Sequence, residues 1–91
     1  MRIRYTAIAL SDLSELACYA LEHHEKGAVQ VLGSTVREAI EVRLKRFPEM
    51  GKVGQVPGTR ELVLTRINVV VTYQTEGQDL WVLSILRAEH E

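Results

Sequence analysis

The apolar positions in the first part of the chain recur first at strand spacing and then at helical spacing. Residues 2–5 alternate polar and apolar side chains, which predicts a short strand, and Thr6 is suited to cap a following helix. From Ala7 to about His24, apolar residues three or four positions apart predict that helix. These residues are Leu10, Leu13, Ala17, Ala20 and Leu21. We expect Asp12, Glu15 and Glu22 on its solvent side.

A second helix is predicted between the break at residues 25–27 and Pro48. Its apolar positions are again three or four residues apart: Val29, Leu32, Val36, Ile40, Leu44 and Phe47. Pro48 ends it, because proline lacks the backbone N–H that a helix interior needs. Two amphipathic helices joined by so short a break are expected to pack as an antiparallel hairpin.

The second half of the chain has the pattern of strands. Residues 49–58 contain three glycines and a proline, which predicts a loop. Three β-rich runs follow at residues 61–64, 69–73 and 80–86, and their short separators predict antiparallel hairpins with the last two runs at the centre. The order β-α-α-β-β-β predicts an α+β fold, in which an N-terminal strand and a helical hairpin join a small, mainly antiparallel sheet.

Composition narrows the class of protein. The length of 91 residues predicts one domain, 1–91, and 46% hydrophobic with 25% charged residues is typical of a folded globular chain. A formal net charge of -1 is unlike proteins that grip phosphates nonspecifically. The single cysteine cannot form an internal disulfide, and no apolar run has the length of a signal or membrane segment. We expect a cytoplasmic protein that does not bind membranes.

Metal, thiol and stacking chemistry receive little support. His23 and His24 are adjacent, and neighbouring helical residues point about 100° apart, so they are not spaced to share a metal ion. Cys18 has no nearby histidine or second cysteine to activate it, which favours a small packing residue in the helix. Tyr73 and Trp81 lie in the middle of strands and are expected to pack in the core. We expect no metal and no cofactor.

The remaining candidates for a site are basic residues near strand ends: Lys52, Arg60, Arg66, Arg87 and His90. Around one side of the sheet they would form a target-binding surface. In a metal-free ribonuclease, arginines would stabilise the phosphate and a histidine would move protons, so Arg60, Arg87 and His90 are the catalytic candidates. Their spacing alone favours the simpler interpretation that they are solvated strand ends.

Five stretches, which cover nearly the whole chain, resemble the RelE/ParE toxin family. They are Arg4 to Thr6 with Asp12 and Leu13, then Phe47 to Lys52, Val56 to Leu62, Val69 to Tyr73, and Ile85 to His90. The resemblance implies a helical hairpin on a small antiparallel sheet, as the periodicity also predicts. It further implies a growth-arresting toxin, often serving plasmid maintenance, that a cognate antitoxin neutralises.

The family has two branches, and charge favours one of them. The resemblance implies either RelE-like cleavage of messenger RNA on the ribosome or ParE-like inhibition of DNA gyrase. Work inside an RNA cavity rewards many basic residues, yet residues 51–91 hold four Lys and Arg against five Asp and Glu. No tyrosine follows Tyr73 and the chain has one residue after His90, unlike RelE-like nucleases. The ParE-like branch is therefore favoured, with the nuclease as the alternative.

A third interpretation is a non-toxic binding or regulatory module on the same fold. If the chain is a toxin, the antitoxin is expected to order in a groove between the helices or on the free strand edge at residues 2–5. Contact with DNA would then be indirect, through the toxin–antitoxin complex. Arg60→Ala is expected to affect growth arrest more than stability, unless the side chain of Arg60 is buried.

Overall fold

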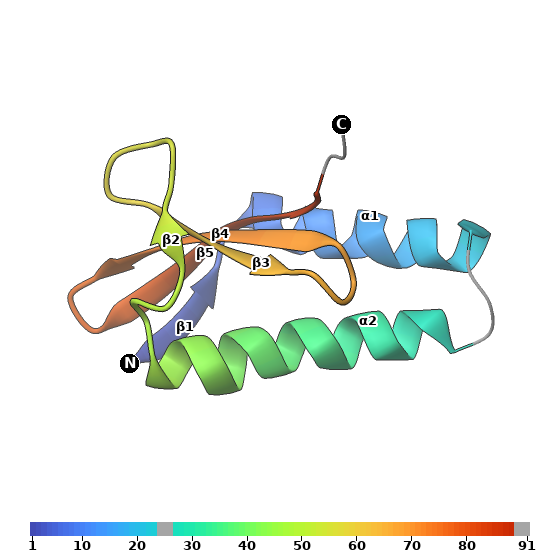
Figure 1. Ribbon diagram of the computed structural model, residues 1–91, viewed down its shortest axis with the longest axis horizontal. Helices are drawn as coiled ribbons and strands as arrows, with labels where there is room; N and C mark the ends of the chain where they lie inside the picture. The colour runs from blue at the N-terminus through green and yellow to red at the C-terminus, as the bar shows by residue number, and fades with distance from the viewer. Residues whose placement is uncertain (24–26, 89–91) are drawn as a thin grey trace.

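The computed structural model, which describes residues 1–23 and 27–88, contains one five-stranded mixed sheet and a helical hairpin (Figure 1). The strands are β1 (Arg2–Tyr5), β2 (Lys52–Val53), β3 (Arg60–Leu64), β4 (Val69–Glu76) and β5 (Asp79–Arg87). Their order in the sheet is β1-β5-β4-β3-β2. The helical segments are α1 (Ala7–His23), α2 (Ala28–Arg37) and η1 (Glu38–Leu44).

The predicted α+β fold class is confirmed, and so is the central position of the last two predicted strands. Successive strands from β2 to β5 pair antiparallel, whereas β1 pairs parallel with β5. The short strand β2 was not predicted, because three glycines and a proline dominate its neighbourhood. It forms because Lys52 and Val53 pair with Glu61 and Arg60 at the edge of the sheet.

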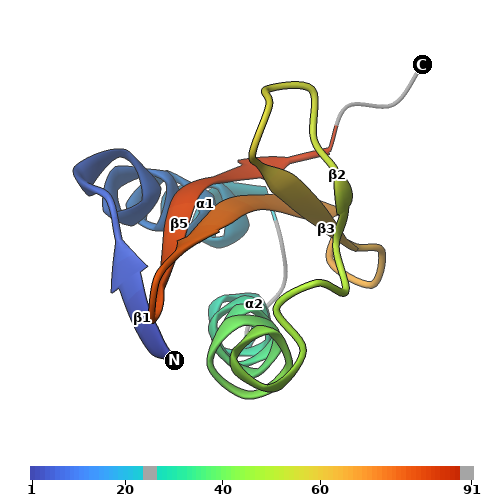
Figure 2. The ribbon, with the colours of Figure 1, turned by 90° about the vertical axis from the view of Figure 1, so that its left-hand side faces the viewer.

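The core lies between the helices and one face of β4 and β5. Alternate residues of these strands point to this face and are fully buried: Val69, Val71, Tyr73, Leu80, Val82 and Ile85. A bulge interrupts the alternation, because Thr72 pairs with Ser84 whereas Tyr73 pairs with Val82, which leaves Leu83 unmatched. Figure 2 shows the sheet curving around α2, with α1 beside β5.

Two side chains of the segment after β1 occupy the edge of β5 beyond Tyr5. The Thr6 hydroxyl donates a hydrogen bond to the Leu83 carbonyl (3.0 Å), and an Asp12 carboxylate oxygen accepts one from the Ile85 amide (3.0 Å). Thr6 also caps α1, as predicted, because its hydroxyl oxygen accepts the Ala9 amide proton. The prediction that Asp12 lies on the solvent side was wrong, because its carboxylate replaces a strand partner for β5.

The buried stripe of α1 agrees with the predicted one only in part. Ala20 is buried and Leu13 packs against the core, as predicted, whereas Leu10 and Leu21 are 54% and 72% exposed. Ala9 and Leu16 are buried instead. Cys18 is also exposed, so its interpretation as a packing residue was wrong.

The second predicted helix is continuous but changes its winding. Ala28–Arg37 is an α-helix and Glu38–Leu44 is a π-helix, whose wider turns a spacing of three and four cannot reveal. Val36, Ile40 and Leu44 are buried as predicted, but Phe47 is 57% exposed, because it follows the helix and lies outside the core. The predicted end of the first helix at His24 lies outside the described residues. No helix in the described part of the chain is long and apolar enough to span a membrane.

Candidate functional site

The structure divides the predicted site residues into two groups. Lys52 and Arg60 lie where β2 meets the start of β3. Arg66 lies in the turn after the other end of β3, and Arg87 ends β5 opposite Val69. His90 lies outside the described residues. The four described basic residues therefore do not converge on one cluster, contrary to the arrangement that a single phosphate site would need.

Arg60 is engaged by the fold. Its guanidinium donates hydrogen bonds to the carbonyl oxygens of Gly51 (2.8 Å) and Glu49 (3.4 Å). The side chain is partly buried and holds the turn that connects η1 to β2. Arg60 therefore has a structural role in the described part of the chain, which the sequence pattern did not predict.

The same turn is held from the other side by Tyr73. The Tyr73 hydroxyl donates to the Pro48 carbonyl (2.8 Å) and accepts from the Gly51 amide (2.9 Å). Burial raises the pKa of Tyr73. The prediction that Tyr73 packs in the core is confirmed, since its side chain is fully buried. Together, Tyr73 and Arg60 fix the conformation of residues 48–51.

Trp81 lies on the other face of β5 from Leu80 and Val82. It is partly buried, and the Arg4 guanidinium carbon lies 5.8 Å from the centre of its ring. The prediction that Trp81 belongs to the core was therefore wrong, because the pleat of β5 turns it away from the helices.

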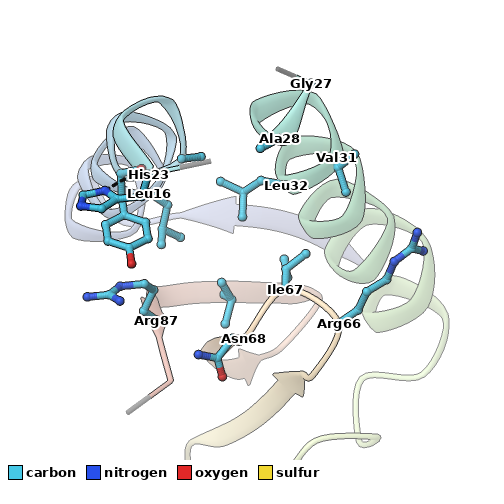
Figure 3. Close-up of a pocket in the computed structure, with 13 residues that line it drawn as sticks. Leu16, His23, Gly27, Ala28, Val31, Leu32, Arg66, Ile67, Asn68 and Arg87 are labelled. Atoms are coloured by element: carbon cyan, nitrogen blue, oxygen red, sulfur yellow. Dashed lines mark hydrogen bonds between the residues drawn. The ribbon is translucent and has the colours of Figure 1, made fainter. Parts of the chain in front are cut away.

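A groove of about 940 Å³ lies between α1, α2 and the turn that joins β3 to β4 (Figure 3). Its walls come from Leu16, Tyr19, Ala20 and His23 of α1, from Ala28, Val31 and Leu32 of α2, from Gly27, and from Arg66, Ile67, Asn68, Val69 and Arg87. Volumes of ~300–1,000 Å³ are common for ligand pockets. This groove contains two of the predicted site residues, Arg66 and Arg87.

Arg87 is stacked against α1 at one side of the groove. Its guanidinium carbon lies 4.1 Å from the centre of the Tyr19 ring, and the Tyr19 ring stacks on the His23 ring with a centroid distance of 4.2 Å. The His23 Nδ1 lies 3.1 Å from the Tyr19 carbonyl oxygen. A planar guanidinium on an aromatic face is a favourable cation–π arrangement. These contacts fix the position of Arg87 at the wall of the groove.

The sheet side of the groove is closed by Asn68. Its φ angle of 60° places it in the left-handed region, where Asn is better tolerated than most residues. The Ala88 amide donates to the Asn68 carbonyl (2.8 Å), and the Asn68 side chain donates to the Ala88 carbonyl (3.3 Å). These two bonds tie the end of β5 to the β3–β4 turn, next to Arg87.

A second, smaller hollow of about 530 Å³ lies beside β1, at the edge of the sheet. The Tyr5 hydroxyl donates to a Glu41 carboxylate oxygen (3.0 Å). Partial burial, together with this bond and the negative charge of Glu41, raises the pKa of Tyr5 to about 12. Arg2 and Arg4 pair with Asp79 at 2.8 Å and 3.2 Å. The prediction that residues 2–5 form an edge strand is confirmed.

Metal binding finds no support in the described residues. Within residues 1–23 and 27–88, no three His, Cys, Asp or Glu side chains cluster as metal ligands would. Sequence analysis missed Tyr19, Ile67 and Asn68 as groove residues. Asn68 was detectable in principle, because Asn in a short turn often adopts a positive φ, but the partners of Tyr19 depend on tertiary structure.

The fold is similar to that of chains in solved ParDE and RelE structures. A chain from "Chromosomal ParDE TA system from P. aeruginosa" superposes with a TM-score of 0.80 at 23% identity, over 98% of this chain and 97% of that chain. The isolated E. coli RelE toxin superposes with a TM-score of 0.59 at 16% identity, over 99% of this chain and 86% of that chain. At such identities the likeness shows the fold alone.

Sequence comparison gives the family. Residues 3–91 match the family described as the ParE toxin of the type II toxin–antitoxin system parDE. The Sinorhizobium fredii protein named "Putative toxin Y4kP" is 30% identical to this chain over 90 residues. The match covers 99% of this chain and 91% of that protein. The chain belongs to the ParE toxin family.

Proposed function

We propose that this protein arrests growth by inhibiting DNA gyrase, without cutting RNA, and that a cognate antitoxin neutralises it. The observation that carries the proposal is the bonding of Arg60 to the Gly51 and Glu49 carbonyls. A metal-free ribonuclease needs basic side chains directed at one phosphate. In the described residues, the Arg60 guanidinium is instead directed at the protein's own backbone.

Charge supports the same conclusion. Residues 51–91 carry four Lys and Arg against five Asp and Glu, so this half of the chain has no basic excess for an RNA-lined cavity. A protein that binds another protein needs a complementary surface rather than a net positive charge. Since gyrase works on DNA inside the cell, the proposal also places the protein in the cytoplasm.

The ribonuclease alternative keeps one supporting observation, the similarity of the fold to that of E. coli RelE. His90 would then be the proton-transfer group, and removing such a group costs ~10²-fold or more in rate. A gyrase inhibitor has no proton to transfer, so His90→Ala should leave its inhibition largely intact unless His90 lies at the centre of the interface.

Two parallel reactions separate the branches. The purified chain is added to gyrase with relaxed and supercoiled plasmid, and to translating ribosomes with a labelled message. We expect impaired supercoiling or trapped cleaved DNA in the first reaction and intact message in the second. Codon-phased cleavage that His90→Ala abolishes would overturn gyrase inhibition and establish the nuclease alternative.

An antitoxin partner is supported by relatives of the same fold. One solved relative belongs to a ParDE system, and another to the intact RelBE toxin–antitoxin complex of E. coli. A partner that binds only the folded toxin raises its melting temperature by mass action. We expect the gene of the antitoxin beside that of this chain, and the melting temperature should rise when the protein encoded by that neighbouring reading frame is added at saturation.

Growth assays test the non-toxic alternative. Induction of this chain alone should stop growth, and joint induction with the neighbouring frame should restore it. Normal growth after induction of the chain alone, with folded protein present in the cells, would instead establish a binding or regulatory module. Contact of the complex with DNA would be made by the antitoxin.

A further inference from the structure

The hollow beside β1 is lined by more positive than negative side chains. Arg2, Arg4 and Lys45 are its cations, and within the described part of the chain Glu41 is the one acidic residue in its lining. Figure 1 shows β1 next to the end of the helix that contains η1, so the cations come from two separate elements. The chain as a whole has a formal net charge of -1. The hollow is therefore a local concentration of positive charge.

Asp79 orders the two arginines without neutralising both. Its two carboxylate oxygens accept one hydrogen bond each, from Nε of Arg2 at 2.8 Å and from Nε of Arg4 at 3.2 Å. A guanidinium has five N–H donors, so both groups keep donors beyond the one directed at Asp79. The side chains of Arg2 and Arg4 are 67% and 43% exposed, whereas that of Asp79 is 19% exposed. A ligand that approaches from solvent therefore meets the arginines before the carboxylate.

The negative charge of Glu41 is engaged on the inner side of the hollow. Its carboxylate accepts a hydrogen bond from the Tyr5 hydroxyl at 3.0 Å. Burial raises the pKa of Tyr5, and the positive charge of Arg37 opposes this rise, so Arg37 also lies close enough to offset part of the charge of Glu41. Lys45, by contrast, is exposed and forms no ion pair with residues 1–23 or 27–88.

We propose that this hollow binds a phosphate group, with the guanidinium groups of Arg2 and Arg4 and the ammonium group of Lys45 as its donors. The planar fork of arginine matches the oxygens of phosphate and forms short, charge-assisted hydrogen bonds, and lysine serves the same anion as a point charge. This site is independent of the proposed gyrase inhibition, because it shares no residue with the groove between α1 and α2 or with the turn at residues 48–51.

The donor set selects phosphate over other ligands. A carboxylate has two oxygens, which a single guanidinium can satisfy, whereas a phosphate has enough oxygens to accept from several cations at once. Apolar ligands gain little here, because charged side chains dominate the lining. The volume of about 530 Å³ also leaves room for part of the molecule that carries the phosphate. That carrier is either a free phosphorylated molecule or a nucleic-acid backbone.

The test therefore uses one probe for each source of phosphate. The purified full chain is titrated at low ionic strength with sodium pyrophosphate, followed by calorimetry, and with a short labelled DNA duplex, followed by fluorescence anisotropy. Arg2→Gln, Arg4→Gln and Lys45→Gln each remove one positive charge from the hollow. The matched control is Arg46→Gln, which removes one positive charge at the next position after Lys45 but outside the hollow.

We expect each hollow variant to weaken pyrophosphate binding about 3-fold or more, and Arg46→Gln to change it by less than about 1.5-fold. Melting temperatures of the free variants identify any unfolded protein. Lys45→Gln keeps the test decisive if a variant of Arg2 or Arg4 unfolds, because Lys45 is exposed.

A second pair of variants tests the sign of the effect. Glu41→Gln removes the negative charge from the hollow and keeps an amide oxygen for the Tyr5 hydroxyl, so phosphate binding should strengthen about 3-fold or more. Glu15→Gln makes the same change of net charge at an exposed position of α1 and should alter binding by less than about 1.5-fold. Loss of a merely structural residue would not strengthen binding.

The duplex distinguishes the two sources. Duplex binding that weakens in the three hollow variants would assign the phosphate to a nucleic-acid backbone. Pyrophosphate binding that weakens in them, with duplex binding absent or unchanged, would assign it to a free phosphorylated molecule. Both results support a phosphate site beside β1.

Three results would overturn this site. The first is that neither probe binds the wild-type chain. The second is that folded Lys45→Gln and Arg46→Gln weaken binding equally, because binding would then follow net charge rather than the hollow. The third is weaker binding by folded Glu41→Gln, because a carboxylate that lines a phosphate site must oppose the anion.

Discussion

At the residue scale, the structure changes the interpretation of Arg60 from a surface cation to a residue that holds a turn. Its two hydrogen bonds to the Gly51 and Glu49 carbonyls tie a loop to the sheet, and removal of the side chain takes a charged donor from the carbonyl of the buried Gly51. Bonds to charged groups contribute about 1.5–3 kcal/mol. The earlier expectation, that Arg60→Ala leaves stability nearly unchanged, is therefore replaced.

We now expect Arg60→Ala to lower the free energy of unfolding by about 1–3 kcal/mol, whereas Lys52→Ala changes it by less than about 0.5 kcal/mol, because Lys52 is exposed. Urea titrations of the three proteins provide the measurement. Equal midpoints for both variants would show that the bonds of Arg60 contribute nothing and would restore its role as a free surface cation.

A second residue-scale prediction concerns Tyr5 at alkaline pH. Its pKa in the folded protein is raised from 10.0 to about 12, first by burial and then by Glu41, so the unfolded chain loses this proton at a lower pH than the folded chain. The stabilising effect is complete below pH 10 and disappears as pH rises through 12. Tyr5→Phe removes it.

The stability difference between wild type and Tyr5→Phe should therefore be constant at neutral pH and shrink progressively above pH 10. Denaturant midpoints for both proteins at a series of pH values up to about 11.5 measure it. The comparison of two proteins cancels the contribution of Tyr73, whose pKa is also raised. A difference that stays constant throughout this range would contradict the raised pKa of Tyr5.

At the element scale, Gly51 and Gly33 differ in the space around them, so alanine should have opposite effects on stability at the two positions. A Cβ on Gly51 would lie 2.6 Å from the Tyr73 hydroxyl and 2.9 Å from the Glu61 carbonyl oxygen. A Cβ on Gly33, within α2, would meet nothing within 4 Å. Gly51→Ala should destabilise by about 1–3 kcal/mol through overpacking. Gly33→Ala should stabilise by about 0.5–1 kcal/mol, because glycine weakens a helix interior.

Thermal unfolding of the two glycine variants gives the answer directly, since 1 kcal/mol moves the melting temperature of a chain of this size by about 4–8 °C. The shifts should have opposite signs. If Gly51→Ala melts like wild type, the turn at residues 48–51 is free to move away from Tyr73, and its close packing has no energetic weight.

The elements themselves were largely predictable, whereas their contacts were not. Apolar periodicity located both helices and the three long strands, because burial on one face leaves a period in the sequence. Asp12 was misplaced because a carboxylate that accepts a strand amide has the same sequence pattern as one in water. The groove pair Tyr19 and Arg87 is 68 positions apart in sequence and no local pattern connects them.

At the scale of the whole molecule, protection against hydrogen exchange should follow the sheet order. β4 and β5 have strand neighbours on both sides and carry fully buried side chains, so opening them requires global unfolding. We expect their amides to exchange most slowly. The two residues of β2, at the edge and exposed, should exchange fastest among the strands. Equal protection of β2 and β4 would contradict this order.

The parallel pairing of β1 with β5 also bears on how the protein is made. Arg2 pairs with Asp79 and Tyr5 with Val82, so the first strand finds its partner only after the last strand has been synthesised. Contacts between residues so distant in sequence form late, since closing a long loop costs entropy. A nascent chain that ends before β5 lacks both the neighbour of β1 and the position of Arg87. The complete five-stranded sheet therefore forms only after the ribosome has passed the codons of β5.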